Sequence, residues 1–402
     1  MIAIYTLTSS LHDAARIDDV TRSFLDSLDV TTDYLGSDLT GYGTHDLDVI
    51  YVRTGGSEGL FLKALPQLLN TSRRPFYLLT NGKNNSLAAA LEILSYLNNN
   101  GYRGEVIHGD IAYISSRLKT LEQTNRALAV LSRQRLGVIG KPSDWLISSV
   151  YDAAAVRRAT GIEIVDIPME EVLDAYHALP ETIEPSADLA SRATAPHLAK
   201  AVDGAERLYL SIRDVVKAHD LTGFTIRCFD LLTAVRNTGC WALARLNAEG
   251  ITAGCEGDVP SLLSMAIARA LTGHGAFQSN PSRIDPVTGQ LTFAHCTIPL
   301  DIVDNYSLDT HFESGIGIGI VGDCKSQPVT LFKTSGDLGC HFVTTAHLER
   351  CETKADLCRT QFVITLDDAA DAQYFLKRPI GNHHIIVPGN IKPAIEALFE
   401  NF

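Results

Sequence analysis

The sequence predicts an α/β protein with parallel sheets in its N-terminal half and a β-rich, antiparallel, barrel-like domain at its C-terminal end. Residues 1–165 alternate short apolar strand signals with segments of helical spacing. That alternation is typical of parallel sheets covered by helices on both faces. Residues 290–366 instead carry short strand signals separated by glycine-marked turns, which is typical of antiparallel sheets.

A chain of 402 residues is too long for one ordinary core and should divide into domains. We expect a first α/β domain over residues 1–85 and a second over 86–200. The second would end in a connector at 179–200 that is rich in Pro, Glu, Ser and Ala. A β-rich domain over 201–402 would complete the chain and carry the candidate metal site.

Short apolar runs in the N-terminal half predict strands at 2–7, 48–53, 75–80, 104–108, 135–140 and 162–166. Helical spacing between them predicts helices at 12–28, 58–69, 87–99, 114–133 and 145–157. Parallel α/β sheets bind ligands at the carboxyl ends of their strands. We therefore expect substrate contacts from the loops at 53–58, 81–86 and 140–145.

The second half of the chain mixes both signals. Helices are expected at 198–219, 229–249 and 260–272, and strands at 292–298, 315–321, 328–332 and 362–366. The stretch 315–322 alternates Gly with apolar residues, and no helix follows it, so it does not indicate a nucleotide-binding loop. It predicts a strand with one face bare of side chains, against which another backbone packs.

Composition limits the possible partners. The apolar content of 45% and the charged content of 20% describe a soluble globular protein. A formal net charge of -13 argues against nucleic acid or an anionic membrane as a partner. The eight Cys residues include no CxxC pair, which favours reduced thiols in a cytoplasmic protein. We see neither a signal peptide nor an apolar run of membrane-spanning length.

The stretch Ala253–Pro260 presents two carboxylates at a strand-to-helix corner. Glu256 and Asp258 lie two residues apart between glycines, and a helical run follows Pro260. A cation or a sugar hydroxyl could reach carboxylates at such a corner. Asp258 could instead only cap the following helix, whereas a metal-binding or catalytic role is favoured for Glu256.

Several histidines could supply nitrogen ligands beside Glu256. His295 lies in an apolar strand, where a satisfied core histidine is the alternative, and His383 and His384 begin a strand near the C-terminus. Neighbours on a strand point to opposite faces, so only one of that pair can enter a given site. With Glu256 these donors would suit a divalent transition metal.

Two other stretches carry polar side chains beside apolar ones. His311 and Glu313 would share one face of a strand, where they could bind sugar hydroxyls or transfer protons; a surface pair without a role is the alternative. The stretch Gly140–Trp145 follows a strand without Walker spacing. It is interpreted either as a helix cap at Ser143 or Asp144, or as a polar wall of a substrate pocket.

The order of five motifs resembles the L-fucose isomerase and L-arabinose isomerase superfamily, in its shorter fucose-isomerase-related branch. The motifs are CEGDVPSLLSMAIARALTG, NPSRID, FAHCTIPL, THFESGIGIGI and GNHHIIVPG, and the N-terminal loop NNSLAAALEI adds to them. The resemblance is densest between residues 225 and 390. It implies two Rossmann-like N-terminal domains, a β-rich C-terminal domain and Mn²⁺-dependent aldose–ketose isomerisation. It also implies a homo-oligomer, a trimer or a hexamer, with sites near subunit contacts.

The resemblance also implies roles for individual residues. Glu256 is similar to the first acidic metal ligand, His384 to the C-terminal histidine ligand, and His295 to a histidine ligand of the arabinose branch. Asn280 stands beside the place of a second acidic ligand, which is where this sequence departs from the family. Asp258 or Glu313 could compensate for that loss.

The expected reaction passes through an enediol. Glu256 would move a proton between C1 and C2, with His311 or Glu313 shuttling the hydroxyl proton and Asn280 in the catalytic set. The expected sugar-binding residues, counted together, are Arg53, Asn81, Asn85, Lys141 and Asp258. An anionic sugar would also need a cation, for which Lys83, Arg283 and Lys333 are further candidates. The alternative is a non-catalytic or chemically diverged sugar-binding relative.

Overall fold

A computed structural model describes residues 1–71 and 74–402. The chain forms two compact units, one of residues 1–126 with 397–401 and the other of residues 127–396 with Phe402. Among the described residues, no helix is both long enough and apolar enough to cross a lipid bilayer. The candidate site lies within the second unit.

The first unit is built on a five-stranded parallel sheet in the order β2-β1-β3-β4-β5. Its strands are β1 (Ile2–Leu7), β2 (Thr32–Gly36), β3 (Leu47–Val52), β4 (Phe76–Leu79) and β5 (Gly104–Ile107). Its helices are α1 (Ala14–Asp26), α2 (Glu58–Thr71) and α3 (Ser86–Asn99), with η1 (Lys83–Asn85) before α3. The helix α4 (Ile111–Leu131) begins in this unit and ends in the second. Residues of α2 and α3 pack on one face and residues of α1 and α4 on the other. The central strands β1, β3 and β4 are buried on both faces, so they are mostly apolar, with Thr6 and Asp48 as buried polar exceptions.

The second unit begins with a four-stranded parallel sheet in the order β7-β6-β8-β9. Its strands are β6 (Arg135–Ile139), β7 (Glu163–Ile167), β8 (Gly223–Ile226) and β9 (Thr252–Cys255). The helices of this region are α5 (Ala153–Thr160), α6 (Met169–Ala178), α7 (Ala187–Arg192), α8 (Pro196–Ala199), α9 (Val202–Ala218), α10 (Phe229–Ala234), α11 (Cys240–Ala248) and α12 (Val259–Thr272).

A closed six-stranded antiparallel barrel completes the second unit, in the order β10-β11-β16-β15-β14-β17. The barrel strands are β10 (Phe277–Ile284), β11 (Gln290–His295), β14 (Gln327–Thr334), β15 (His341–Glu352), β16 (Thr360–Leu366) and β17 (His384–Pro388). The strands β12 (Asn305–Asp309) and β13 (Gly319–Asp323) form a separate pair, and η2 (Leu300–Ile302), η3 (Ala369–Asp371), α13 (Ala372–Lys377) and α14 (Lys392–Phe399) complete the order. The predicted fold class, parallel α/β followed by an antiparallel barrel, is confirmed.

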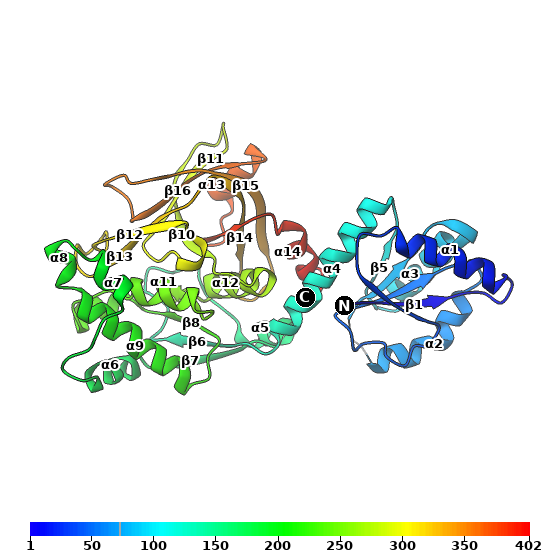
Figure 1. Cartoon of the computed structure of the whole chain (residues 1–402), viewed down its shortest axis with the longest axis horizontal. Coiled ribbons are helices and arrows are strands. Elements are labelled where there is room, and N and C mark those ends of the chain that lie inside the picture. The colour runs from blue at the N-terminus through cyan, green and yellow to red at the C-terminus, as the bar shows by residue number, and fades with distance from the viewer. Residues whose placement is uncertain (72–73) are drawn as a thin grey trace. The chain divides into compact units, whose positions relative to one another are not determined.

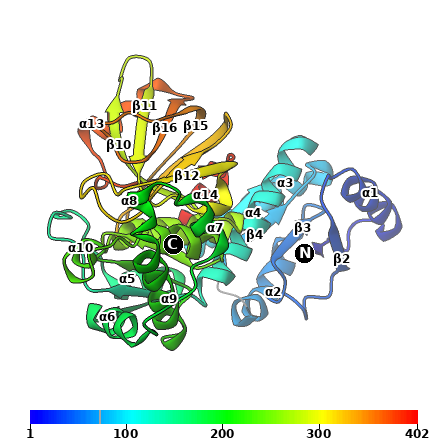
Figure 2. The ribbon, with the colours of Figure 1, turned by 60° about the vertical axis from the view of Figure 1, so that its left-hand side comes forward.

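Helix α12 joins the two layers of the second unit. It follows β9 directly, contacts β8 and β9 of the parallel sheet, and also contacts β14, β17 and β10 of the barrel (Figure 1). Nearly the whole helix is buried, which agrees with its apolar sequence on all sides. Figure 2 shows the barrel strands β10, β11, β15 and β16 standing together as one layer. The corner between β9 and α12 therefore lies between sheet and barrel.

Both expected domain boundaries differ from the observed sheets. Strand β5 pairs with β4, so the first sheet continues past residue 85. Strands β8 and β9 belong to the sheet of β6 and β7, so the second α/β region continues past residue 200. The Pro-rich connector at 179–200 lies inside the second unit. Composition did not mark the domain boundary, because the partners of a strand are set by tertiary pairing.

Two local predictions also need correction. The helix expected at 145–157 begins only at Ala153, where Asp152 caps it, because the preceding residues make tertiary contacts instead. The strand expected at 315–321 begins only at Gly319. Gly315 and Gly317 have φ angles of 66° and 65°, which do not suit a strand. A Cβ on Gly317 would lie 2.5 Å from Thr238 Oγ1, so the expected close approach of other atoms does occur there.

We expect Phe277→Ala to lower the free energy of unfolding by about 3–5 kcal/mol, because it removes a buried ring from the barrel core. Phe277 is fully buried, and its ring centroid lies 5.0 Å from that of Phe362. Val287→Ala, in the exposed turn between β10 and β11, is the control and should leave stability unchanged. Urea denaturation measures both, and equal losses would contradict this account of the core.

Candidate functional site

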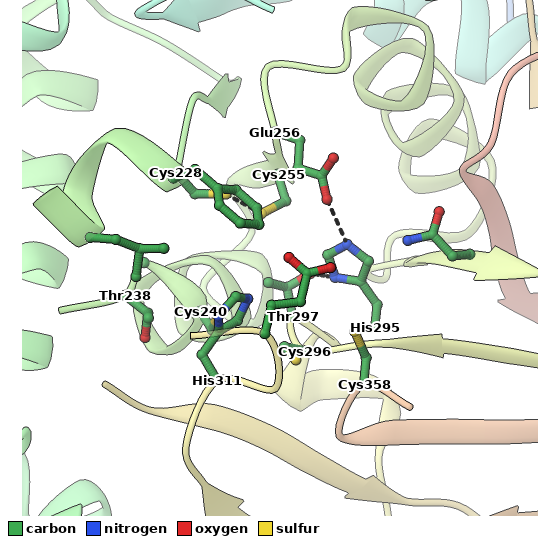
Figure 3. Close-up of a pocket in the computed structure, with 15 residues that line it drawn as sticks. Cys228, Thr238, Cys240, Cys255, Glu256, His295, Cys296, Thr297, His311 and Cys358 are labelled. Atoms are coloured by element: carbon green, nitrogen blue, oxygen red, sulfur yellow. Dashed lines mark hydrogen bonds and ion pairs between the residues drawn. The ribbon is translucent and has the colours of Figure 1, made fainter. Parts of the chain in front are cut away.

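A pocket opens at the carboxyl ends of β8 and β9 (Figure 3). Its lining comes from both layers of the second unit: Cys228, Phe229, Leu232, Thr238, Gly239, Cys240, Cys255, Glu256, Asn280, His295, Cys296, Thr297, His311, Glu313 and Cys358. The parallel sheet supplies the carboxylate Glu256, and the barrel supplies the imidazole of His295. Carboxyl ends of parallel strands are where ligands of such sheets bind.

Glu256 occupies a sharp turn directly after β9. Its φ angle of 64° lies in the left-handed region that residues with a side chain seldom adopt. Gly257 follows with a φ of 71°, and a Cβ there would lie 2.5 Å from the carbonyl oxygen of Lys141. Only glycine fits the second position, and the turn directs the nearly buried Glu256 carboxylate into the pocket (Figure 3).

Two imidazoles face this carboxylate. Glu256 Oε1 lies 3.6 Å from His295 Nε2 and 3.5 Å from His383 Nε2. One ligand atom from each of the three residues lies within 4.8 Å of the others, and all three residues are buried. One carboxylate oxygen and two imidazole nitrogens form a donor set suited to a divalent transition metal.

Each imidazole is oriented by a hydrogen bond through its other nitrogen. His383 Nδ1 lies 2.8 Å from Asp258 Oδ2, and His295 Nδ1 lies 2.9 Å from Thr297 Oγ1. This leaves both Nε2 atoms directed at Glu256, and His383 Nε2 makes no hydrogen bond to any described residue although it is fully buried. Metal-binding histidines are normally fixed in this way by an outer hydrogen bond. The residues therefore fit a bound divalent cation.

Asp258 is the centre of a buried polar network. Its side chain caps α12 by accepting a 2.8 Å hydrogen bond from the Ser261 backbone N–H. The Lys333 ammonium, fully buried on β14, lies 3.4 Å from the same carboxylate and donates to Ser261 Oγ at 2.7 Å. The capping alternative is correct for Asp258, but the carboxylate also positions His383. Asp258 is fully buried and is not among the residues that line the pocket, and its expected role in sugar binding stays a prediction.

Charges inside the network shift its protonation. Burial alone would raise the pKa of the Glu256 carboxyl, but His383 and His295 outweigh it and hold that pKa well below its usual range. The pKa of Asp258 is likewise lowered, by Lys333 and His383 against the effect of burial. Burial opposes protonation of His383, yet the two carboxylates raise its pKa to about 9. Glu256 is thus ionised, and the two carboxylates favour a positive charge on His383.

The expected histidine ligand, His384, is replaced in this group by its neighbour His383. His384 Nε2 lies 3.0 Å from the Tyr374 hydroxyl, and its ring lies among Phe293, Phe342 and Phe375. Burial lowers its pKa to about 3, with Lys333 adding to the effect. As expected, the two neighbouring rings point to opposite sides, and the ring that faces Glu256 is that of His383.

The other expected catalytic residues line the same pocket. Asn280 lies on β10 and accepts a 3.1 Å hydrogen bond from Asn382 Nδ2. His311 Nδ1 lies 3.0 Å from Ser314 Oγ, and its ring packs against Phe229. Glu313 is exposed at the pocket wall. His311 and Glu313 lie in the turn between β12 and β13, not on a strand.

The remaining expected residues lie elsewhere in the chain. Arg53, Asn81 and Asn85 belong to the first unit, where they follow β3 and β4. Arg53 is bound within that unit by Thr8 and by an ion pair with Asp18. Lys141 is exposed after β6. Of the residues that line the pocket, none is Lys or Arg.

Sequence reasoning missed two features of the pocket. Trp145 ends the stretch 140–145 that was considered as a helix cap or a pocket wall, but its contact with the carboxylate was not expected: its indole N–H donates to Glu256 Oε2 at 2.7 Å. Five thiols line the pocket, and Cys228 Sγ lies 2.9 Å from Cys255 Sγ. Scattered cysteines and a single tryptophan carry no spacing signal, so only the fold could bring them together.

Comparison with known proteins identifies sugar isomerases as distant relatives. No protein-family model matches the chain. A sulfoquinovose isomerase of Clostridium sp. (strain MSTE9) is 38% identical over 99 residues, which is 24% of this chain and 22% of the relative. Sulfoquinovose isomerases of Priestia aryabhattai and Priestia megaterium (strain ATCC 12872 / QMB1551) are each 22% identical over 264 residues, 62% of this chain and 59% of the relative. The matches thus span less than two thirds of each relative.

We expect Asp258→Asn to lower the free energy of unfolding by about 3–5 kcal/mol, because the buried Lys333 ammonium would lose its counter-charge. The double variant Asp258→Asn/Lys333→Met removes both charges and should recover part of the loss. Chemical denaturation of the metal-free protein measures all three proteins. A single variant as stable as the wild type would mean that this ion pair does not support the fold.

Proposed function

We propose that the chain is a divalent-metal-dependent aldose–ketose isomerase whose active site is the pocket around Glu256. One observation carries the proposal: Glu256, His295 and His383 are all buried, and each brings one donor atom within 4.8 Å of the other two. The distant relatives named sulfoquinovose isomerase support the same reaction class. The motif order described above supports it independently.

Glu256, His295 and His383 would hold the cation, and Mn²⁺ is the ion we propose. The cation would act as a Lewis acid toward the sugar's carbonyl oxygen and the adjacent hydroxyl oxygen. Asn280 would stand at the pocket edge as a neutral amide that hydrogen-bonds to a sugar hydroxyl. The contact between His383 Nδ1 and Asp258 would fix the ring, so that Nε2 is already oriented when its proton leaves on metal binding.

The proton transfers would be carried out by the carboxylates and the imidazole of the pocket. Glu256 would remove the proton from C2 of the aldose, leaving an enediol, and return a proton to C1 of the ketose. His311 or Glu313 would move the hydroxyl proton from O2 to O1, so that no atoms are gained or lost. The thiols and the Phe229 ring would limit the access of water to the enediol.

The substrate class follows from the relatives and needs a direct test. Sulfoquinovose is the first sugar to assay, because three relatives carry its name. The described pocket wall offers carboxylates, thiols and hydroxyls but no Lys or Arg. Neutral sugars such as L-fucose and L-arabinose therefore belong in the same panel.

We expect the protein to bind one Mn²⁺ per chain and to release about one proton per ion at pH 7. A histidine must be neutral to bind a metal, and the carboxylates raise the pKa of His383 to about 9 despite its burial. The proton release should fade as the pH rises through 9, since His383 is then already neutral. Isothermal titration calorimetry in buffers of different ionisation enthalpy measures both quantities.

The two adjacent histidines provide the matched control for that titration. His383→Gln should abolish Mn²⁺ binding, while His384→Gln, which changes a residue bound to Tyr374, should retain it. The reverse result would return the ligand role to His384. If both variants still bind Mn²⁺, neither histidine is a metal ligand.

We expect Mn²⁺-loaded protein to interconvert an aldose and its ketose, and Glu256→Gln to lower kcat by at least about 10²-fold as a general base is lost. In D₂O the product should carry solvent deuterium at C1 or C2, since Glu256 exchanges its proton with solvent. Glu313→Gln provides the comparison for the second carboxylate. A metal-loaded wild type that binds a sugar without converting it would instead indicate a sugar-binding relative.

A further inference from the structure

Residues 141–145, which follow β6, surround the turn that carries Glu256. The backbone N–H of Ser143 donates to the carbonyl oxygen of Glu256 at 3.0 Å. The Trp145 indole N–H donates to Glu256 Oε2 at 2.7 Å. Gly257 lies so close to Lys141 and Pro142 that a Cβ there would approach their backbone atoms to 2.5 and 2.8 Å. We call residues 141–145 the clamp segment.

The clamp segment is itself held firmly in place. Arg227, at the end of β8, donates from Nη1 to the Pro142 carbonyl oxygen at 2.7 Å and from Nη2 to Asp144 Oδ2 at 2.7 Å. The Trp145 ring meets the Phe229 ring edge to face, with centroids 4.8 Å apart. The indole therefore has a defined position, although half of the Trp145 side chain is exposed to solvent.

Because of the clamp segment, the two carboxylate oxygens of Glu256 have different partners. Oε1 faces the Nε2 atoms of His295 and His383, whereas Oε2 accepts the indole N–H. A hydrogen bond to an ionised acceptor is stronger than one between neutral groups. The carboxylate thus presents Oε1 to the two imidazoles, while one of the two lone pairs of Oε2 accepts the indole N–H.

We propose that Trp145 is a positioning residue that keeps Glu256 a one-oxygen ligand of the bound cation. The inference rests on the proposed metal site. With Oε2 engaged by the indole, Glu256 offers the ion only Oε1. A large ion such as Ca²⁺ commonly takes both oxygens of a carboxylate. The indole therefore disfavours Ca²⁺ and favours smaller divalent ions such as Mn²⁺.

The contact itself can be tested in metal-free protein by NMR of the indole ¹⁵N–H groups. The chain has two tryptophans, so Trp145→Phe and Trp241→Phe assign the two resonances. The Trp145 resonance should lie downfield in the wild type and move upfield in Glu256→Gln, because the acceptor loses its charge. The Trp241 resonance should not move, since that indole donates to Glu206. An unchanged chemical shift of the Trp145 indole N–H in Glu256→Gln would overturn the proposal. This measurement remains possible even if Trp145→Phe does not fold, because Trp241→Phe then assigns the two resonances.

The consequence for the ion is measured by calorimetry with Mn²⁺ and with Ca²⁺. Trp145→Phe keeps a ring against Phe229 but has no N–H, and should bind Mn²⁺ about 10-fold more weakly, as is usual for loss of an outer hydrogen bond. Its preference for Mn²⁺ over Ca²⁺ should fall at the same time. Ile147→Ala, which shortens a largely exposed side chain just beyond the clamp segment, should leave both affinities unchanged.

The outcomes separate this inference from the function on which it rests. Wild type and Trp145→Phe that bind both ions equally well would overturn the role of Trp145 and leave the proposed isomerase intact. A wild type that binds no Mn²⁺ would overturn the proposed function, and the role of Trp145 with it. Weaker Mn²⁺ binding with an unchanged preference over Ca²⁺ would also reject the one-oxygen geometry.

Discussion

The buried charge of Asp258 is the constraint on which the second unit depends. This carboxylate caps α12, pairs with Lys333 of β14 and holds the imidazole of His383, which directly precedes β17. It therefore joins the helix that follows the parallel sheet to two neighbouring strands of the barrel. A buried anion must be compensated by its neighbours, so helix, barrel and imidazole can take only one arrangement relative to each other. The geometry at Glu256 follows from that arrangement.

The backbone turn at Glu256 is strained, and the contacts around it hold the carboxylate in the pocket. A residue with a side chain in the left-handed region costs on the order of 1–3 kcal/mol, and the surrounding structure has to hold it there. Here Gly257 allows a close backbone approach, and the Ser143 N–H binds the Glu256 carbonyl oxygen. The result is a carboxylate directed away from its own strand and into the pocket between the two layers.

Much of this could be predicted from the sequence because it depends on local pattern. The alternation of strands and helices gave the fold class, and two glycines with two acids marked the strand-to-helix corner. The choice between His383 and His384 could not be made in the same way. Which neighbour points inward depends on the register of β17 against β10, where His384 pairs with Ser279. That register is set by partners more than a hundred residues away in the chain.

Trp145 and the sheet boundaries escaped prediction for related reasons. The apolar spacing after Ser143 indicates a helix, but Ser143 and Trp145 bind Glu256, which is far away in sequence. Strands β8 and β9 follow a Pro-rich connector, yet they add to the sheet that begins with β6. In each case a long-range hydrogen bond overrides a local preference, and one sequence alone does not reveal such bonds.

The closed barrel has a consequence for the two imidazoles. His295 ends β11 and His383 precedes β17, and the one strand that separates them in the ring is β10. Peptide hydrogen bonds fix the spacing of neighbouring strands, and a closed ring has no free edge along which a strand could slide. The gap between the imidazoles is therefore set when the chain folds, before anything enters the pocket. An ion or ligand that binds here has to fit this gap, because the closed ring of strands cannot contract around it.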